Sequence, residues 1–454
     1  MADFRRDTRD FLMHLEKSEL VTRLMALQKH VSETKEKEFG IIAKKEHKQR
    51  DVDWSKASYR RIALKFAYLG AKFNGLQIQT ACASTVESYL WRAIVRAKLR
   101  KADDMPGEGY SRCARTDKGV SAFQQVVTIN LRTKGSETIY SGSKNGADEF
   151  DYVTCINGSL PPEIRILAWC PVSDTFDARH NCTHRVYQYN FPITSKMDLT
   201  KMQNACDKLI GFHDYRNFCK INMSTAMHHE RRILSATVSK SENNEKLAQL
   251  VIASSGFLYH QIRYTVTILL KIGVGLEKVE LIDELLDIVT NPQRPQMHMA
   301  SDAPLILTNC EFGIREDGFG DANGKIEAKY NMPVKNKTEE LNWVCKEPEK
   351  IKKAISNLWF EKTMEQQHIE TLIKVTGMDI FSSDDLLKHV SKDFHTKQHV
   401  PFMKRTKCAS LENEIAADKI RLERRAKRKA EHENGDSVEA GGETPKNSKI
   451  NCVG

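Results

Sequence analysis

One acidic residue in this chain stands where its neighbours would let it do chemistry. Asp117 lies in the stretch SRCARTDKGVSAF, between Arg115 and Lys118, and Gly119 closes the polar turn before an apolar pattern resumes. Because neighbouring cations favour the charged form of a carboxylate, we expect Asp117 to stay ionised. An ionised carboxylate on a tight loop can act as a nucleophile or as a base. Charged surface turns have the same composition, so this loop alone leaves both interpretations open.

Aromatic and basic residues in the second half could hold a planar ligand. In the stretch HRVYQYNF, strand periodicity places Arg185, Tyr187 and Tyr189 on one face. The rings could stack on a nucleobase while the cation meets a phosphate or a carboxylate, whereas a tyrosine pair packed in a core is the alternative. Arg263, in FLYHQIR, opens a predicted helix, where it would either pair with a buried carboxylate or lie on the helix surface.

A metal or thiol centre is the competing chemistry. His180, Cys182 and His184 would share one face of a strand, and His228 and His229 are adjacent. The spacing matches no familiar zinc module, and the eleven cysteines include no CxxC pair. We therefore predict ordinary polar and core roles for these residues, and no metal.

Composition limits the class of protein. The chain has 454 residues, a formal net charge of +10 and 40% hydrophobic residues. It has no apolar run of the roughly 18–20 residues that a membrane span needs and no apolar stretch of secretory type at its start, so we expect a protein of the nucleus or cytoplasm with no membrane partner. The positive charge favours a polyanionic partner, although a basic tail on a neutral enzyme would give the same total.

The acidic loop needs a strand, a helix and a second strand to position it. Alternating apolar residues predict a half-buried strand over 62–68. A helix is predicted from Ser84, with Ser84 and Glu87 as a capping box, and its apolar stripe runs to Ala97. A strand over 125–131 follows the loop.

The second half has the same texture. Strands are predicted over 183–191, 233–239 and 247–254, and helices over 199–210 and 257–274. Strands and helices mix without regular βαβ alternation, which favours an α+β fold.

Both ends of the chain differ from this core. Leu20, Leu24, Leu27 and Val31 follow the spacing of a short coiled coil, so the arm either dimerises, contacts RNA or packs as a single helix on the core. The last stretch is charge-dense, and its basic cluster would be a nuclear import signal, an RNA contact or simply a solvated tail. We divide the chain into a helical arm, an N-terminal catalytic half with the Asp117 loop, a C-terminal catalytic half, a helical extension and a basic, largely disordered tail, at 1–56, 57–165, 166–316, 317–395 and 396–454.

Four stretches, in this order, resemble the TruA family of tRNA pseudouridine synthases, and the resemblance covers roughly 58–315. They are the opening pattern YLGAKFNGLQIQ (68–79), the catalytic loop ARTDKGVSA (114–122), the tyrosine segment FDARHNCTHRVYQYNFP (176–192) and the helix GFLYHQIRYTVTILLKIGVG (256–275).

The resemblance implies a fold, a substrate and roles for four residues. It implies two pseudo-symmetric α/β halves that share an antiparallel sheet with a central RNA-binding cleft, tRNA as the partner, no cofactor and a homodimer. Asp117 stands at the position of the catalytic aspartate and Tyr187 at that of the tyrosine that contacts the target uracil and handles its C5 proton. Arg115 and Arg263 stand at basic positions near the carboxylate and the RNA.

Within the family, GFHDYRNFCK (211–220) is similar to the eukaryotic branch that acts at positions 38 and 39 of the anticodon stem-loop. The chain departs from the family pattern at Ala114 and Gln124, where glycine is usual. Two functions follow. One is uridine isomerisation, with Asp117 either attacking C1′ or removing the 2′ proton. The other is a catalytically weak or inactive tRNA-binding or chaperone protein on the same fold.

Overall fold

The fold falls into two compact units of chain, and each is described separately. The computed structural model describes residues 52–79, 84–101, 107, 109–134, 149–221, 228–312, 341–377, 383–395, 398–417, 419–421, 423 and 424. The leucines of the predicted arm and most of the basic cluster of the predicted tail lie outside these residues. Unit 1 comprises Met1–Ser195, Ile233–Gly256 and Ala300–Ser391, and unit 2 comprises Lys196–Arg232, Phe257–Met299 and Lys392–Gly454.

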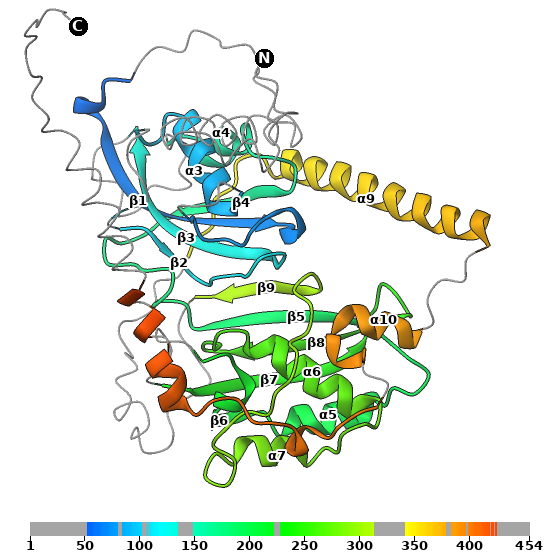
Figure 1. The fold of residues 1–454 in the computed structure, drawn as a ribbon. Helices are drawn as coiled ribbons and strands as arrows, with labels where there is room; N and C mark the ends of the chain where they lie inside the picture. Colours follow the sequence, from blue (N-terminus) through cyan, green and yellow to red (C-terminus); the bar gives the residue numbers. More distant parts are fainter. Residues whose placement is uncertain are drawn as a thin grey trace, which may run out of the picture. The chain divides into compact units, whose positions relative to one another are not determined.

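Unit 1 is built on a mixed sheet whose strands run in the order β4-β1-β3-β9-β5-β8-β7, with β2 paired to β3 (Figure 1). The described pairings in this unit are antiparallel except the parallel pair β3–β9. The strands are β1 (Ser58–Tyr68), β2 (Ser111–Arg112), β3 (Ser121–Thr133), β4 (Ile164–Pro171), β5 (His184–Pro192), β7 (Glu230–Lys240), β8 (Leu247–Ser254) and β9 (Leu305–Glu311). Strands and helices together confirm the predicted α+β class.

The first predicted strand is confirmed as β1, but it is covered on both faces. Ile62 and Leu64 are fully buried, as the alternation predicts, and so is Ala63 on the opposite face. Since β1 lies between β3 and β4, its middle part has no solvent-facing edge.

The helix that precedes the Asp117 loop begins later than the sequence predicts. Helix α3 spans Val86–Arg96, and its N-cap is Thr85, whose side chain accepts from the Ser88 N–H. The predicted capping box of Ser84 and Glu87 is therefore wrong. Glu87 is buried and has other partners, described below. Helix α4 (Tyr152–Asn157) packs against α3 and against β4.

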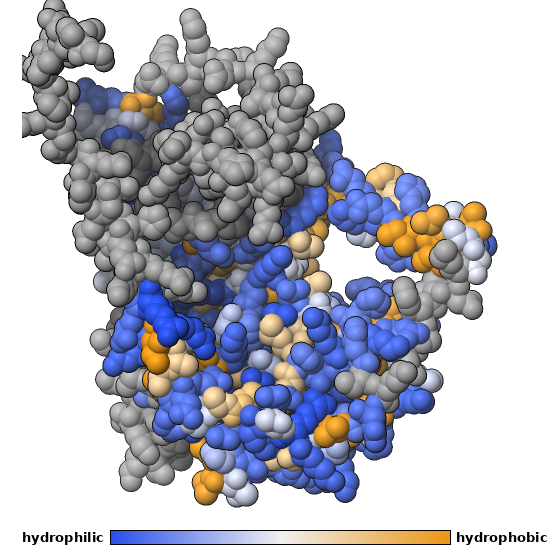
Figure 2. Space-filling model, in the orientation of Figure 1, coloured by the Kyte–Doolittle hydropathy of each residue, from blue (hydrophilic) through white to orange (hydrophobic). Residues whose placement is uncertain are grey.

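Two more helices of unit 1 lie in the stretch for which the sequence predicts a helical extension. Helix α9 (Pro348–Thr376) starts with proline at its first turn and ends at Gly377 in the left-handed conformation. It buries no residue, and Figure 2 shows apolar side chains on its surface. Helix α10 (Ser383–Val390) contacts β5, and the Ser301 N–H donates to the Val390 carbonyl.

Unit 2 is mainly helical. It contains α5 (Leu199–Asp207), β6 (Gly211–Asp214), α6 (Gln261–Gly273) and α7 (Leu281–Leu286). All thirteen residues of α6 are buried, and at Gly273 an added Cβ would lie 2.6 Å from the Met202 sulfur of α5. The two helices therefore approach closely because residue 273 has no side chain.

Residues of the predicted tail contribute to unit 2. Phe402 is fully buried, and the Asp393 carboxylate accepts from Arg405 at 2.6 Å. Lys271 of α6 donates to the Asp393 carbonyl at 2.8 Å. Among the described residues, no helix is both long and apolar enough to cross a membrane.

Candidate active site

The Asp117 loop joins β2 to β3 in unit 1. Asp117 is half-buried and precedes a turn at Lys118 and Gly119. The turn is closed by a hydrogen bond from the Val120 N–H to the Asp117 carbonyl at 3.2 Å, and Gly119 adopts a φ of +82°. The loop therefore has a defined path that presents its one carboxylate where the strand begins.

The segment after β1 holds this loop from one side. The Tyr68 hydroxyl and the Thr116 hydroxyl are hydrogen-bonded at 2.6 Å, and the Leu76 N–H donates to the Thr116 carbonyl. Gly75 has a φ of +87°, and an added Cβ would lie 3.0 Å from that same carbonyl. At Gly70 an added Cβ would lie 2.0 Å from the Val120 carbonyl. The two glycines of the YLGAKFNG stretch are thus required by close approach to the Asp117 loop.

Ala114, where the family usually has glycine, fits the loop without strain. Both its backbone groups bond to the side chain of Gln125, at 3.2 Å for its N–H and 3.0 Å for its carbonyl. The described non-glycine residues with positive φ are Lys98 and His260. Ala114 is not among them, so this position does not require glycine.

Tyr187 lies in β5, between β8 and β9. It pairs with Ile252 on one side and with Leu307 on the other, and its side chain is buried. Leu307 also pairs with Ala122 at the start of β3. Two strand spacings of about 4.8 Å therefore separate Tyr187 from Ala122, roughly 10 Å between backbones. The chain that leaves the Asp117 turn and the strand that carries Tyr187 thus meet at one level of the sheet.

The Tyr187 phenol is protonated at neutral pH. Burial raises the pKa of Tyr187 well above its usual value, and the nearby Cys310, Cys113 and Tyr68 groups add to the shift. Since Tyr68 is also the partner of Thr116, Tyr187 shares a neighbour with the residue that precedes Asp117. A protonated phenol can donate a proton or hydrogen bond, or pass a proton on.

Arg185 and Tyr189 share the buried face of β5 with Tyr187, as predicted, but they serve the backbone. Arg185 donates to the carbonyls of Cys113, Cys182, Arg179 and Ser255, at 3.0, 3.3, 2.6 and 2.6 Å. The Tyr189 hydroxyl donates to the Ser301 carbonyl at 2.9 Å. The structure thus assigns Arg185 a role in fixing the approach to the loop, in place of the predicted contact with phosphate or carboxylate.

Cations surround the Asp117 loop. Arg115, Lys118 and Arg179 are exposed. The pKa of Arg115 is lowered from its usual value by partial burial and by the neighbouring Arg112 and Arg179 cations. These groups lie on the surface from which a polyanion would reach Asp117.

A buried carboxylate beneath the loop was missed by sequence reasoning. Glu87 accepts from Arg112 at 2.5 Å, from the Tyr110 hydroxyl at 2.9 Å and from the Ile78 N–H at 3.0 Å. It therefore ties α3 to the strand that leads into the loop. In the sequence its only signal is a glutamate on the apolar side of the helix, where the pattern instead predicts a cap.

Arg263 belongs to unit 2, whereas Asp117, Arg115 and Tyr187 belong to unit 1. Arg263 is buried in the first turn of α6 and so does not lie on a helix surface. The helix begins only after His260, which adopts a φ of +63°. The predicted part of Arg263 near the carboxylate and the RNA stays a prediction.

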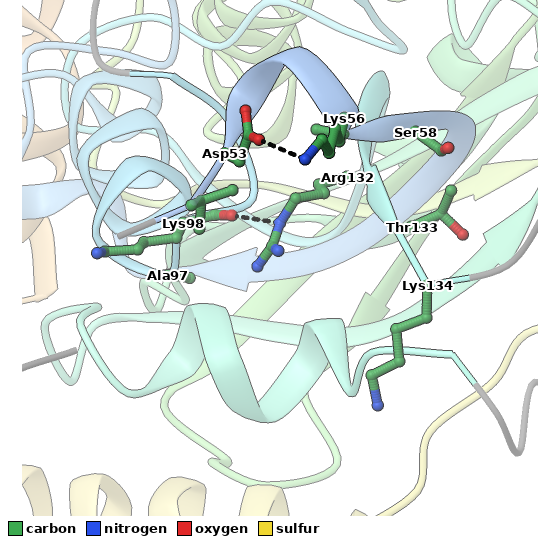
Figure 3. Close-up of a pocket in the computed structure, with 10 residues that line it drawn as sticks. Asp53, Lys56, Ser58, Ala97, Lys98, Arg132, Thr133 and Lys134 are labelled. Atoms are coloured by element: carbon green, nitrogen blue, oxygen red, sulfur yellow. Dashed lines mark hydrogen bonds and ion pairs between the residues drawn. The ribbon is translucent and has the colours of Figure 1, made fainter. Parts of the chain in front are cut away.

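A basic cavity of about 590 Å³ lies at the far end of β3 (Figure 3). Its lining includes Lys56, Lys98, Arg132 and Lys134 against the single acid Asp53. Asp53 is ion-paired with Lys56 at 3.4 Å, and Arg132 is oriented by the Lys98 carbonyl at 2.8 Å. The cavity has the charge to hold a phosphate.

The structure does not assemble the metal group that the sequence suggested as a competitor. Among the described residues, one set of three His, Cys, Asp or Glu side chains has ligand atoms close enough to share an ion, namely Cys113, Cys182 and Cys310. Cys182 thus belongs to a cluster of thiols and not to a group with His180 and His184.

Comparison with known proteins shows the family of the chain. The family profile described as tRNA pseudouridine synthase matches residues 205–313. The "Probable tRNA pseudouridine synthase tag-124" of Caenorhabditis elegans is 33% identical over 402 residues, which are 81% of this chain and 92% of that protein. The chain therefore belongs to the TruA family of tRNA pseudouridine synthases, a class of RNA-modifying proteins.

Within the family it falls in the eukaryotic branch. The tRNA pseudouridine(38/39) synthase of Bos taurus is 40% identical over 281 residues, 58% of each chain, and that of Saccharomyces cerevisiae is 34% identical over 314 residues, 65% of this chain and 70% of the yeast protein. The match thus spans little more than half the length of the bovine protein.

Proposed function

We propose that this protein isomerises uridine to pseudouridine in tRNA, at positions 38 and/or 39 of the anticodon stem-loop. The observation that carries the proposal is the anchored Asp117 loop, whose strand β3 shares Leu307 as a register partner with Tyr187. The names of the bovine and yeast relatives support the two positions.

The reaction breaks the N1–C1′ bond of uridine and joins C5 to C1′. The base loses a proton at C5 and gains one at N1, so no atom or electron is exchanged overall. Asp117 either attacks C1′ or removes the 2′ proton, and an ionised carboxylate serves both routes. Tyr187 contacts the uracil and handles the C5 proton.

The target uridine must leave its stack before Asp117 can reach it, which costs a few kcal/mol. Stacking on an aromatic side chain contributes about 1–3 kcal/mol per base and offsets part of this cost. The exposed Arg115, Lys118 and Arg179 supply phosphate contacts around the loop. The family resemblance also assigns Arg263, in unit 2, a part in substrate binding.

The wider setting is also part of the proposal. Two pseudo-symmetric halves, 57–165 and 166–316, would flank a central RNA-binding cleft, and the arm would serve a homodimer. The protein would work in the nucleus or the cytoplasm. The neighbouring β3 and β9, one from each half, support the pairing of the halves.

A catalytically inactive tRNA binder is the rival function. It was suggested by Ala114 and Gln124, which stand where the family usually has glycine, and the structure accommodates both residues. Ala114 needs no glycine conformation, and Gln124 accepts a hydrogen bond from Lys65 at 3.5 Å. Tritium release from tRNA labelled at uracil C5 tests the two functions directly. Release above background supports the synthase, and tight binding without release would support the inactive protein.

A further inference from the structure

Three buried thiols meet beside the base of the Asp117 loop. Cys113, Cys182 and Cys310 are 3%, 6% and 5% exposed. Their sulfur atoms all lie within 4.8 Å of one another. Nothing in the proposed reaction uses them, and they come together from three segments that are far apart in the chain.

The backbone fixes each sulfur independently. Cys113 follows β2, and its N–H donates to the Val126 carbonyl of β3 at 2.8 Å. Cys182 precedes β5, and its thiol donates to the His184 carbonyl at 3.3 Å. Cys310 lies in β9, opposite Arg185 in the ladder with β5. One sulfur therefore lies within a strand and the other two lie one or two residues from a strand end, where the sheet limits their movement.

We propose that Cys113, Cys182 and Cys310 bind one Zn²⁺ ion. Zn–S bonds of about 2.3 Å in a tetrahedral site place the sulfurs about 3.8 Å apart, so sulfurs within 4.8 Å need to move by an ångström or less. Binding converts three thiols to thiolates and releases three protons. Among the described residues no fourth protein ligand joins the set, so a water or another small ligand completes the tetrahedron.

The charge of Arg185 balances the charge of the proposed zinc–thiolate group. Three thiolates and one Zn²⁺ carry a net charge of −1, which would be costly to bury alone. The Arg185 guanidinium is 9% exposed, donates to the Cys113 and Cys182 carbonyls, and interacts electrostatically with all three sulfurs. Arg185 therefore supplies the compensating positive charge, and ion and guanidinium together are neutral.

Such an ion would cross-link the site. Cys113 lies four residues before Asp117, Cys182 leads into the strand of Tyr187, and Cys310 lies in β9 between them. The ion would join these three segments by bonds that do not depend on tRNA. The inference concerns metal content and holds whether or not the proposed reaction is right.

Metal analysis of the full-length protein tests the site. We expect about one zinc per chain after purification under reducing conditions without chelators. The variants Cys113→Ser, Cys182→Ser and Cys310→Ser should each lose most or all of this zinc. Cys170→Ser and Cys206→Ser remove thiols that are equally buried but lie in β4 and α5, and these variants should keep the zinc. Zinc retained in the three cluster variants would overturn the proposal.

X-ray absorption at the zinc edge tests the ligand set in the wild-type protein, so the result does not depend on whether a variant folds. Three sulfur scatterers at about 2.3 Å and one lighter atom are expected. A shell of nitrogen and oxygen alone, or of four sulfurs, would refute the assignment. So would stoichiometric copper in place of zinc, a disulfide among the three cysteines, or metal-free protein whose three thiols all react with a thiol reagent after denaturation.

Discussion

The proposed reaction depends on one residue, Asp117. Asp117→Ala should leave tRNA affinity nearly unchanged, because the exposed cations around the loop remain. It should lower the rate of pseudouridine formation by at least roughly 10²–10⁴-fold, the usual contribution of a positioned acid or base. Single-turnover assays on unmodified tRNA measure the rate, and filter binding measures the affinity.

Asp174→Ala is the matched control, since Asp174 is an exposed carboxylate of the same unit. It should behave as the wild type. Pseudouridine formed at the wild-type rate by the Asp117 variant would remove this residue from the mechanism.

Tyr187 and Tyr189 offer a paired test on one strand face. Tyr187→Phe keeps the ring and loses the hydroxyl, so turnover should fall more than affinity. Tyr189→Phe loses a hydrogen bond to the Ser301 carbonyl and should cost about 1 kcal/mol of stability without changing turnover. Equal losses of turnover and affinity in the Tyr187 variant would argue against proton handling.

Single residues also mark how far sequence alone could go. The roles predicted for Asp117 and Tyr187 rest on the resemblance of four ordered stretches to the TruA family, because the loop and the strand each had an ordinary alternative on their own. The partners of Arg185 could not be predicted, because they are main-chain carbonyls that carry no sequence signal. The cysteine cluster escaped for the same reason, since its members are far apart in the chain and follow no ligand spacing.

At the scale of elements, the contact between the Asp117 loop and the segment after β1 depends on Gly75. Gly75→Ala places a Cβ 3.0 Å from the Thr116 carbonyl and 3.4 Å from the Asp117 carbonyl carbon. The positive φ adds about 1–2 kcal/mol of strain. We expect lower stability together with a clear loss of turnover, measured by denaturant unfolding and the tRNA assay.

Gly275→Ala is the control that has the backbone strain of a positive φ without the contact to the Asp117 loop. Gly275 has a φ of +76°, but nothing lies within 4 Å of its added Cβ. This variant should lose similar stability and keep its turnover. If both variants lost turnover alike, Gly75 would have no special relation to the loop.

Helix α6 carries a lysine whose burial predicts a pH dependence. Burial lowers the pKa of Lys271 to about 8. In the unfolded chain it titrates near 10.4, so between these values the unfolded state binds more protons. Stability should therefore rise with pH through this window.

The change should be visible against Lys271→Met, which lacks the titrating group. From pH 7 to pH 10 the wild type should gain on the order of 2–3 kcal/mol relative to the variant. Denaturant unfolding at several pH values gives the two curves. Lys201→Met, at an exposed site on α5, should follow the wild type, and parallel curves for Lys271→Met would contradict the prediction.

Hydrophobic periodicity predicts most of the helices and strands, but it does not predict where they begin and end. The strands β1, β3, β5, β7 and β8 and the helices α3, α5, α6 and α9 lie where the sequence predicts them. Helix α6 starts at Gln261 and not at 257, because His260 takes a left-handed conformation that periodicity does not register. The N-cap of α3 is Thr85 and not the predicted Ser84, and Glu87 bonds to Arg112 and does not take part in a capping box.

At the scale of the whole molecule, the basic cavity offers a second place where positive charge could bind tRNA phosphates. The basic cavity lies at the end of β3 opposite to the Asp117 loop, roughly 40 Å along a strand of 13 residues. If tRNA phosphates occupy it, Lys134→Ala and Lys56→Ala should weaken binding of any tRNA by a similar factor. Each should also reduce the slope of log affinity against log salt by about 1.

Binding measured over a salt series checks this, with Lys240→Ala as an exposed control at the end of β7. An unchanged slope in both cavity variants would place the RNA elsewhere. Turnover at saturating tRNA should stay at the wild-type value, since the cavity lies far from the carboxylate.

The position of β9 in the sheet has a consequence for how the protein is made. Residues 305–311 form the strand between β3 and β5, although they come nearly two hundred residues after the Asp117 turn. At about 5–20 residues per second, the ribosome adds this strand many seconds after the loop has emerged. Until then β5 and the first residues of β3 each lack a partner on one side, and a chain cut short before residue 305 would expose them to other chains.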